Sequence, residues 1–255
     1  MTIVSLSIFF VKRGRIPPTA GGNYNGIVII REGGIFVDFF DIIGPVMIGP
    51  SSSHTAGAAR IGRVARDLLG ETPARAEIGL YGSFEKTYQG HGTDRALVGG
   101  LMGMNVDDPR LRDALSMAAA AGMQVRFAPV PLRAAHPNTV VLHITGASGK
   151  SITVRAASVG GGRVMIQELN GLEVNFSGEE DTLIIRHHDA PGAIARVTGR
   201  LAEADVNIAT MRVFRKEEGG DAIMALELDK LPGDAIVESL RQIRGIYDVT
   251  LLKKR

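Results

Sequence analysis

The spacing of apolar residues divides the chain into helical and strand-like segments. Apolar positions recur at helical spacing from Ala58 onward, and Gly70 follows as a stop signal. A second, Ala-rich helix is expected over 113–123. Strand-like alternation or β-branched runs occupy 76–84, 125–128, 139–145, 151–157 and 164–169. These segments predict a mixed α/β region built on a sheet.

The last third of the chain has a more regular pattern. It predicts strand, helix, strand, strand, helix and strand over 182–187, 193–204, 207–214, 221–228, 234–243 and 249–252. This is the βαββαβ order of the ferredoxin-like fold. In its first helix, the predicted core stripe consists of Ile194, Val197, Leu201 and Ala204. We therefore predict an α+β protein with a mixed α/β domain over 37–177, a linker over 178–181 and a ferredoxin-like domain over 182–255.

Residues 1–36 have a different composition from the rest. Pro-Pro, Gly-Gly and Asn-Gly pairs crowd this segment, which otherwise holds one expected strand at 27–30. We interpret it as an N-terminal extension and expect the natural start of translation nearer Val37, which the intact mass of the native protein would test.

Three serines, a histidine and a threonine stand side by side before the first helix. Residues 49–57 read GPSSSHTAG, and the Gly-Pro pair interrupts any regular element before them. At a helix N-terminus, free N–H groups and the macrodipole favour an anion such as a substrate carboxylate. A simple N-cap is the plainer alternative, but it accounts for one of these five side chains. We therefore predict a functional site here.

A second histidine lies between glycines at Gly90-His91-Gly92-Thr93-Asp94. The glycines allow the backbone to approach another group closely, and Thr93 with Asp94 marks the start of another helix. A single histidine in a turn is usually a solvated surface residue. A second imidazole before a helix nevertheless favours a site shared with His54.

Three motifs that resemble ligand sites are interpreted as structural. Residues 146–151 end in Gly-Lys-Ser, but Ile144 stands where a phosphate loop requires its first glycine, so a hairpin turn is expected. Asn170 before Gly171 is most simply a turn residue. His187 and His188 point to opposite faces of a regular strand, so they cannot chelate one ion. We assign no metal ligand to this chain.

Composition narrows the classes of function. The 255 residues are 45% hydrophobic, and 29 Lys and Arg nearly balance 27 Asp and Glu, which predicts neither a nucleic-acid nor a membrane partner. The chain has no cysteine, which excludes a thiol nucleophile and any thiolate metal site of its own. The apolar run 3–11 is too short to span a bilayer, and a cytoplasmic location is expected.

Several of these motifs resemble those of known families. Residues 40–57, FDIIGPVMIGPSSSHTAG, closely resemble the opening of the β subunit of bacterial iron–sulfur-dependent L-serine dehydratases. Residues 90–94 and the Glu-Leu-Asn-Gly stretch at 168–171 look like two later signatures of that family. The Asp-Ala-Pro-Gly-Ala-Ile stretch at 189–194, with Asn-Ile at 207–208, resembles an ACT domain. The resemblance covers about 37–255.

The resemblance implies an L-serine ammonia-lyase that converts L-serine to pyruvate and ammonia. In that family a [4Fe–4S] cluster lies on a cysteine-bearing α subunit, and one iron acts as a Lewis acid on the serine hydroxyl. The absence of cysteine agrees with this division. The chain is then expected to be inactive without its α partner.

The resemblance also implies roles for individual residues. Those expected to bind L-serine are Ser52, Ser53, Thr55, Gly92, Thr93 and Asn170. His54 and His91 are jointly expected to be catalytic, although either imidazole, or a group of the α subunit, could be the general base. The ACT-like module is expected to self-pair and to bind an amino-acid effector through Asp189, Pro191, Gly192, Ala193, Asn207 and Ile208. A dimerisation module that binds nothing is the alternative.

Two other functions compete with the lyase. The chain also resembles the regulatory end of some phosphoglycerate dehydrogenases, which suggests a non-catalytic amino-acid sensor. The chain has no GxGxxG fingerprint, so it contains no recognisable dehydrogenase domain for such a sensor to regulate. A serine hydrolase is a third option, but the chain lacks a GxSxG nucleophile elbow.

Overall fold

The computed structural model describes residues 28–30, 36–38 and 47–254, which belong to two separate units, 1–46 and 47–255. In the first unit, β1 (Val28–Ile30) pairs antiparallel with β2 (Phe36–Asp38). The strand expected at 27–30 is therefore present. Most of the expected N-terminal extension lies outside the described residues, and the predicted start of translation near Val37 stays a prediction.

The second unit contains a six-stranded sheet, which we call the large sheet. Its strands lie in the order β4-β3-β5-β6-β7-β8, and all neighbours are antiparallel except β3 and β4. Their bounds are β3 (Pro73–Gly82), β4 (Gln124–Pro129), β5 (Asn138–Gly146), β6 (Ser151–Gly160), β7 (Arg163–Leu169) and β8 (Leu172–Phe176). The sequence predicted the first five of these and missed β8. The expected hairpin turn between β5 and β6 is confirmed.

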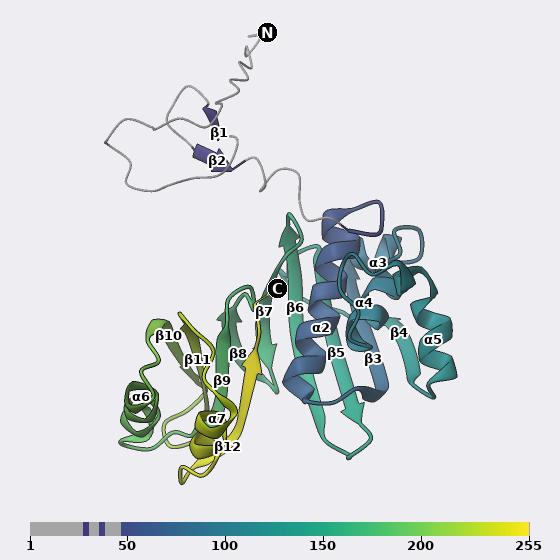
Figure 1. Cartoon of the computed structure of the whole chain (residues 1–255). Helices are drawn as coiled ribbons and strands as arrows, with labels where there is room; N and C mark the ends of the chain where they lie inside the picture. The colour runs from purple at the N-terminus through teal and green to yellow at the C-terminus, as the bar shows by residue number, and fades with distance from the viewer. Residues whose placement is uncertain (1–27, 31–35, 39–46, 255) are drawn as a thin grey trace. The chain divides into compact units, whose positions relative to one another are not determined.

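One face of the large sheet is apolar and carries helices (Figure 1). On β5, Val140, Leu142 and Ile144 are buried while His143 between them is exposed, as expected for a sheet with one covered face. The helical elements are η1 (Ser52–Gly57), α2 (Ala58–Leu69), α3 (Ser83–Thr87), α4 (Thr93–Leu101), η2 (Pro109–Asp113) and α5 (Ala114–Ala120). The helix predicted from Ala58 is confirmed with its stop at Gly70, whose φ is 86°.

Helices α2 and α4 cross in close contact at two glycines. A Cβ atom on Gly62 of α2 would overlap the carbonyl oxygen of Leu97, and one on Gly100 of α4 would overlap that of Ala59. Only hydrogen side chains at these positions allow the two backbones to approach so closely. This crossing fixes the relative position of the segments that precede the two helices.

The C-terminal part of the second unit has the predicted βαββαβ order. Its strands form an antiparallel sheet, the small sheet, in the order β10-β11-β9-β12. The elements are β9 (Thr182–His188), α6 (Ala193–Glu203), β10 (Ile208–Arg215), β11 (Asp221–Leu228), α7 (Asp234–Arg241) and β12 (Ile246–Leu252). Leu183, Ile185 and Met224 on its inner face pack in one core with α6 and α7. The ferredoxin-like fold is confirmed.

Two sequence predictions need correction. Ile194 is 41% exposed, and the core stripe of α6 is Ala193, Val197 and Leu201, because position 194 lies about 100° around the helix from position 193. Phe84 does not continue β3 but lies in α3 with its side chain fully buried. The strand ends at Gly82, whose φ of 65° and ψ of −118° strongly favour glycine.

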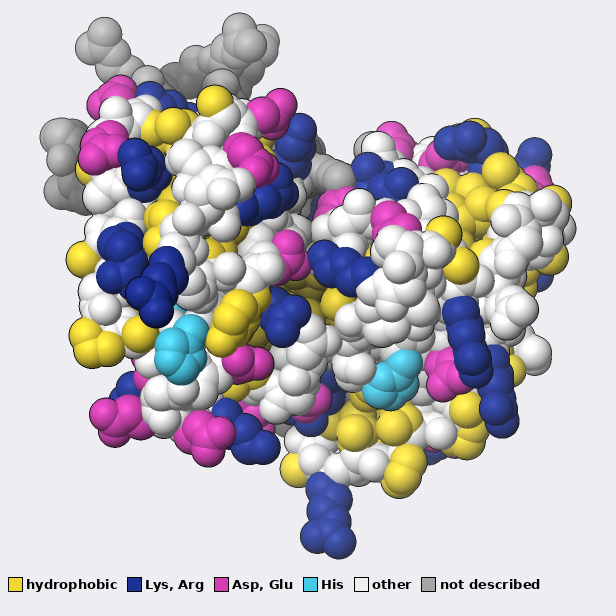
Figure 2. All heavy atoms as spheres, turned by 90° about the horizontal axis from the view of Figure 1, so that it is seen from below, with side chains coloured by type: hydrophobic (Ala, Val, Ile, Leu, Met, Phe, Trp, Pro, Cys, Tyr) yellow, Lys and Arg dark blue, Asp and Glu magenta, His cyan; other side chains and the backbone are white. Residues whose placement is uncertain are grey.

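The surface carries charges of both signs. On the face in Figure 2, Lys and Arg side chains are interspersed with Asp and Glu, and no single-sign patch covers this face. Within the part of the chain that the structure describes, no helix is both long and apolar enough to cross a bilayer.

Candidate active site

Residues 52–57, which the sequence placed before the first helix, form a π-helical turn that runs directly into α2. Ser51 caps this turn: its Oγ accepts a hydrogen bond from the His54 amide at 3.2 Å, and its carbonyl accepts one from the Thr55 amide at 2.9 Å. The amides of Ser52 and Ser53 have no acceptor among the described residues. Two N–H groups at this helix start are therefore available to an anion.

His54 is held on both ring nitrogens by hydroxyl groups. Its Nδ1 lies 3.2 Å from Ser53 Oγ and 3.4 Å from Ser51 Oγ, and its Nε2 lies 3.0 Å from Ser83 Oγ. The ring packs edge-on against Phe84 with centroids 5.3 Å apart. Only 9% of His54 is exposed, so this imidazole is largely withdrawn from water.

His91 lies directly beside His54. The two ring centroids are 4.8 Å apart at an interplanar angle of 88°, and Thr55 Oγ1 donates a hydrogen bond of 3.3 Å to the His91 carbonyl. Gly92, with φ of 68°, turns the chain between His91 and α4. The structure thus joins the two glycine-flanked motifs, one with a buried imidazole and the other with an exposed one.

The surroundings of His54 favour its neutral form. Burial lowers the pKa of His54, and the nearby His91 lowers that pKa further. A neutral imidazole can accept a proton at neutral pH. Asp94, at the second position of α4, is also buried, and burial raises the pKa of its carboxyl group.

The lowered pKa of His54 predicts a pH dependence of stability. Between the lowered pKa of the folded chain and about 6.5 in the unfolded chain, the unfolded state binds more protons, so stability is lost as pH falls through that window. We expect the free energy of unfolding to decrease from pH 7.5 to pH 5.5, and His54→Gln to reduce that decrease. Urea titrations of the unchanged chain and of His54→Gln at the two pH values measure the free energy of unfolding. An equal decrease in the two chains would contradict the burial of a neutral His54.

Thr93 is another buried polar residue near the paired histidines. It is fully buried, and its hydroxyl has no hydrogen-bond partner among the described residues. Its amide donates to the Tyr88 carbonyl at 2.8 Å. A buried hydroxyl without a partner is rare in a folded protein and is a candidate for binding a ligand.

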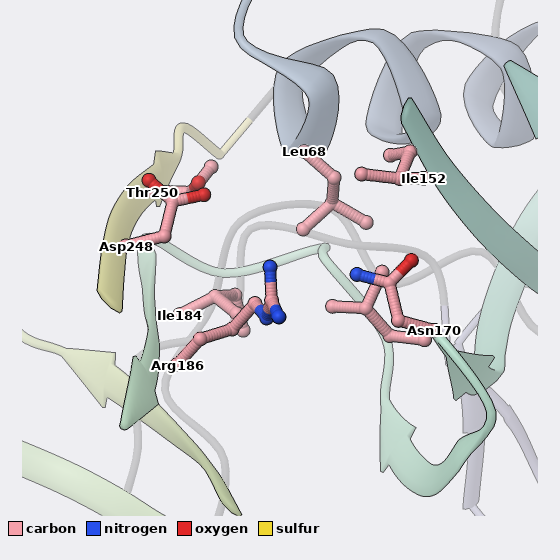
Figure 3. A pocket seen from close by; sticks show the side chains of 8 residues that line it. Leu68, Ile152, Asn170, Ile184, Arg186, Asp248 and Thr250 are labelled. Carbon is pink, nitrogen blue, oxygen red and sulfur yellow. The ribbon is translucent and has the colours of Figure 1, made fainter. Parts of the chain in front are cut away.

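Asn170 lies away from the histidine pair. Its side-chain oxygen accepts a hydrogen bond of 2.9 Å from the Thr153 amide, and its φ of 53° fits the predicted turn. It lines a cavity beside Leu68, near the end of α2 opposite His54 (Figure 3). At about 1.5 Å of helix rise per residue, roughly 20 Å separate His54 from Leu68. The structure therefore does not bring Asn170 to the other predicted substrate-binding residues.

The cavity beside Asn170 lies between the large and small sheets and is small. Its volume is about 10 Å³, room for a single water molecule and not for an amino acid. Figure 3 shows the guanidinium group of Arg186 pointing toward Leu68 and Asn170. The lining residues are Leu68, Ile152, Leu169, Asn170, Ile184, Arg186, Asp248 and Thr250.

The predicted effector residues of the C-terminal region lie at two separate places. Asp189 accepts hydrogen bonds from Arg215 at 2.7 Å and from the Gly219 amide at 3.2 Å, and the Arg215 bond chiefly lowers the pKa of that carboxyl. Asn207 donates to Asp229 at 2.6 Å, at the opposite end of β10. Eight residues of strand at about 3.3 Å each separate these ends by roughly 25 Å, so one copy of the chain does not bring them together.

The other predicted effector residues lie at the start of α6, next to Asp189. Pro191 and Gly192 form the turn before the helix, and Gly192 has φ of 78°. The Ala193 amide donates to the Ala190 carbonyl at 3.1 Å and is therefore not free for a ligand. Ile208, next to Asn207, is half-buried.

The donor groups of this chain do not fit an iron–sulfur cluster. Such clusters are held mainly by cysteine thiolates, and the sequence has no cysteine. The described residues also contain no group of three or more His, Asp or Glu side chains placed to hold a metal ion. His187 is buried and His188 exposed, as expected from their opposite faces on β9.

Sequence patterns gave no indication that Ser83 contacts His54. They also did not distinguish Ser51, which caps the turn, from the serines that follow it. Ser83 is 29 residues from His54 in sequence and follows the end of a strand. No local pattern pairs residues so far apart, whereas Ser51 is recognisable as an N-cap once the helix is known to begin at Ser52.

Known proteins resemble this chain over most of its length. The serine dehydratase beta chain family model matches residues 37–128, and the ACT domain model matches 182–245. The chain is 45% identical to a probable L-serine dehydratase beta chain of Bacillus subtilis over 211 residues, which is 83% of this chain and 96% of the relative. It is 35% identical to the L-serine dehydratase beta chain of Peptoniphilus asaccharolyticus over 216 residues, 84% of this chain and 96% of the relative.

A partial match concerns a different enzyme. A D-3-phosphoglycerate dehydrogenase of Methanocaldococcus jannaschii is 32% identical over 153 residues, which cover 56% of this chain and 29% of that protein.

Proposed function

Since this chain belongs to the serine dehydratase β chain family, we propose that it forms one wall of the active site of an L-serine ammonia-lyase. The enzyme would convert L-serine to pyruvate and ammonia in a complex with a cysteine-bearing α subunit. The observation that carries the proposal is the contact between His54 and His91, with ring centroids 4.8 Å apart, because it joins the two motifs inside the family match.

The binding part of the proposed site is the start of the helical segment. The amides of Ser52 and Ser53 would bind the substrate carboxylate with the help of the macrodipole. The hydroxyls of Ser53 and Thr55 and the segment from Gly92 to Thr93 would surround the rest of the substrate. Thr93 contributes a buried hydroxyl that has no other partner among the described residues. We propose this site without Asn170, because its side-chain oxygen is already bound to Thr153 and it lies at the other end of α2.

The reactive part of the proposed site is the histidine pair. Neutral His54, or His91 beside it, would take the α-proton of serine. Loss of the β-hydroxyl as water then gives 2-aminoacrylate, which tautomerises to the imine and takes up water to release ammonia and pyruvate. Any [4Fe–4S] cluster would be held by the α subunit, since this chain has no thiolate to offer.

The C-terminal ACT domain is proposed to be regulatory. The Asp189 loop of one copy and Asn207 of another would meet only if two such domains pair, because one copy holds them at opposite ends of β10. An amino acid bound there would be an effector. Pairing without any ligand is the alternative.

A sensor without catalytic activity is the second candidate function. The partial match to a D-3-phosphoglycerate dehydrogenase favours it, because the matched region covers 29% of that protein and so leaves out most of the enzyme. A sensor would bind serine by itself and would need no metal-bearing partner.

Anaerobic copurification with the cysteine-bearing α subunit distinguishes the two functions. We expect a brown complex that releases pyruvate from L-serine, and a colourless chain without activity when the α subunit is omitted. The measurements are the absorption spectrum, the iron content and the pyruvate formed. A colourless chain that binds serine by calorimetry, and that fails to activate the α subunit, would support the sensor and contradict the lyase.

A further inference from the structure

Ser83 contacts His54 from a different part of the fold. The other hydroxyls near this ring belong to Ser51 and Ser53, which are in the same turn as His54 and move with its backbone. Ser83 is the first residue of α3, at the end of β3, and its Oγ lies 3.0 Å from His54 Nε2. Of the three hydroxyls, only that of Ser83 fixes the ring relative to the large sheet.

The backbone of Ser83 is firmly placed. Its amide donates to the Pro137 carbonyl at 2.7 Å, and its own carbonyl accepts from Thr87 Oγ1 at 2.8 Å. The preceding Gly82 approaches Pro137 so closely that a Cβ atom there would lie 2.7 Å from the Pro137 carbonyl oxygen. The Ser83 hydroxyl itself has no partner other than His54 among the described residues, so capping does not explain it.

The same short helix also contacts the backbone of the second histidine. Thr87, the last residue of α3, accepts a hydrogen bond of 3.0 Å from the His91 amide through its carbonyl. One end of α3 therefore contacts the ring of His54, and the other end contacts the backbone of His91. The relative position of the two rings depends on this turn.

From these contacts we propose that Ser83 is a positioning residue whose hydroxyl sets the orientation of the His54 ring for proton exchange with the substrate. A neutral imidazole has one donor and one acceptor nitrogen, and a hydroxyl can serve either. With the Ser83 hydroxyl at Nε2, both nitrogens have partners and the ring cannot rotate without losing one. The inference rests on the proposed catalytic role of His54.

Ser83→Ala tests this inference in the complete complex with the α subunit. We expect kcat for L-serine to fall about tenfold with little change in KM. This decrease is a part of the roughly 10²- to 10⁴-fold rate enhancement that general acid–base catalysis contributes. The ring of His54 should titrate at lower pH, because its protonated form loses an acceptor for Nε2–H. The acidic limb of the kcat profile should move in the same direction.

Two further variants control for structural effects. Ser83→Thr keeps the hydroxyl, so its kcat and the pH at which His54 titrates should match those of the unchanged chain. Lys86→Ala changes an exposed side chain on the same helix and should alter neither. Circular dichroism and thermal unfolding show whether each variant is folded.

The titration of His54 is read by nitrogen-15 NMR of the full chain without its partner, with the resonance assigned by its loss in His54→Ala. Unchanged His54 resonances in Ser83→Ala would overturn the inference. A normal kcat in Ser83→Ala, together with an inactive His54→Ala, would also overturn the inference. That result would leave the proposed function intact. If both variants keep full kcat, the catalytic role of His54 on which the inference rests is wrong.

Discussion

His54→Ala, assembled with the α subunit, is expected to lower kcat for L-serine by at least about 100-fold, the lower limit of what a positioned general acid or base contributes. His54 is the buried member of the histidine pair, with both ring nitrogens near hydroxyls and its pKa lowered by burial and by His91. These features keep the ring neutral and fixed in orientation. Alanine removes the only imidazole that has this environment in the described chain.

His91→Ala and His143→Ala complete that experiment. His91 lies against His54 but is exposed, so its loss is expected to decrease kcat or to raise KM, depending on which imidazole takes the proton. His143 is exposed on β5 and contacts Thr153, so His143→Ala should behave like the unchanged chain. Steady-state pyruvate release measures all three. Unaltered turnover in both His54→Ala and His91→Ala would refute the site.

Gly62→Ala is expected to destabilise the fold. The added methyl group would overlap the Leu97 carbonyl oxygen and lie 3.0 Å from the Leu101 amide nitrogen, both of which are backbone atoms of α4. Backbone atoms cannot rotate away as a side chain does, so α2 and α4 must separate. Overpacking of this kind costs typically 1–3 kcal/mol, which lowers the melting temperature by about 2–4 °C per kcal/mol in a chain of this size.

The same substitution should also reduce activity. The segments that carry His54 and His91 come directly before the two helices that cross at Gly62, so separation of the helices displaces the rings. Gly199→Ala is the matched control: Gly199 lies within α6, and a Cβ atom there meets nothing within 4 Å. Alanine at that position should leave activity unchanged and raise stability slightly, by up to about 1 kcal/mol. Equal melting temperatures for the two variants would contradict the close crossing.

Much of the fold follows from local sequence patterns. The apolar spacing from Ala58 to Gly70 and the βαββαβ order after residue 181 predicted elements within a few residues of those observed. The sequence pattern did not predict β8. Asn170 and Gly171 before it indicate a turn, but the strand that follows has only five residues, which are too few for a clear strand pattern. Ile194 was misplaced, because a stripe read from spacing does not show which of two adjacent apolar residues faces the core.

The chemical inventory of this protein follows from its residue types and their short-range order. The sequence establishes that the chain has no thiolate, that two imidazoles each precede a helix, and that hydroxyl groups surround the first of them. These properties depend on residue type and on short-range order. They are therefore readable without any knowledge of which segments meet.

Which of these groups come together depends on how the elements pack against one another. This packing placed His91 against His54 and Ser83 on His54 Nε2, and it moved Asn170 to the opposite end of α2. The first two of these outcomes depend on the crossing of α2 with α4 and on the path of β3 into α3, and the third depends on the pairing of β7 with β6. Contacts across 29 or more residues arise from packing between elements, which the periodicity of each element does not encode.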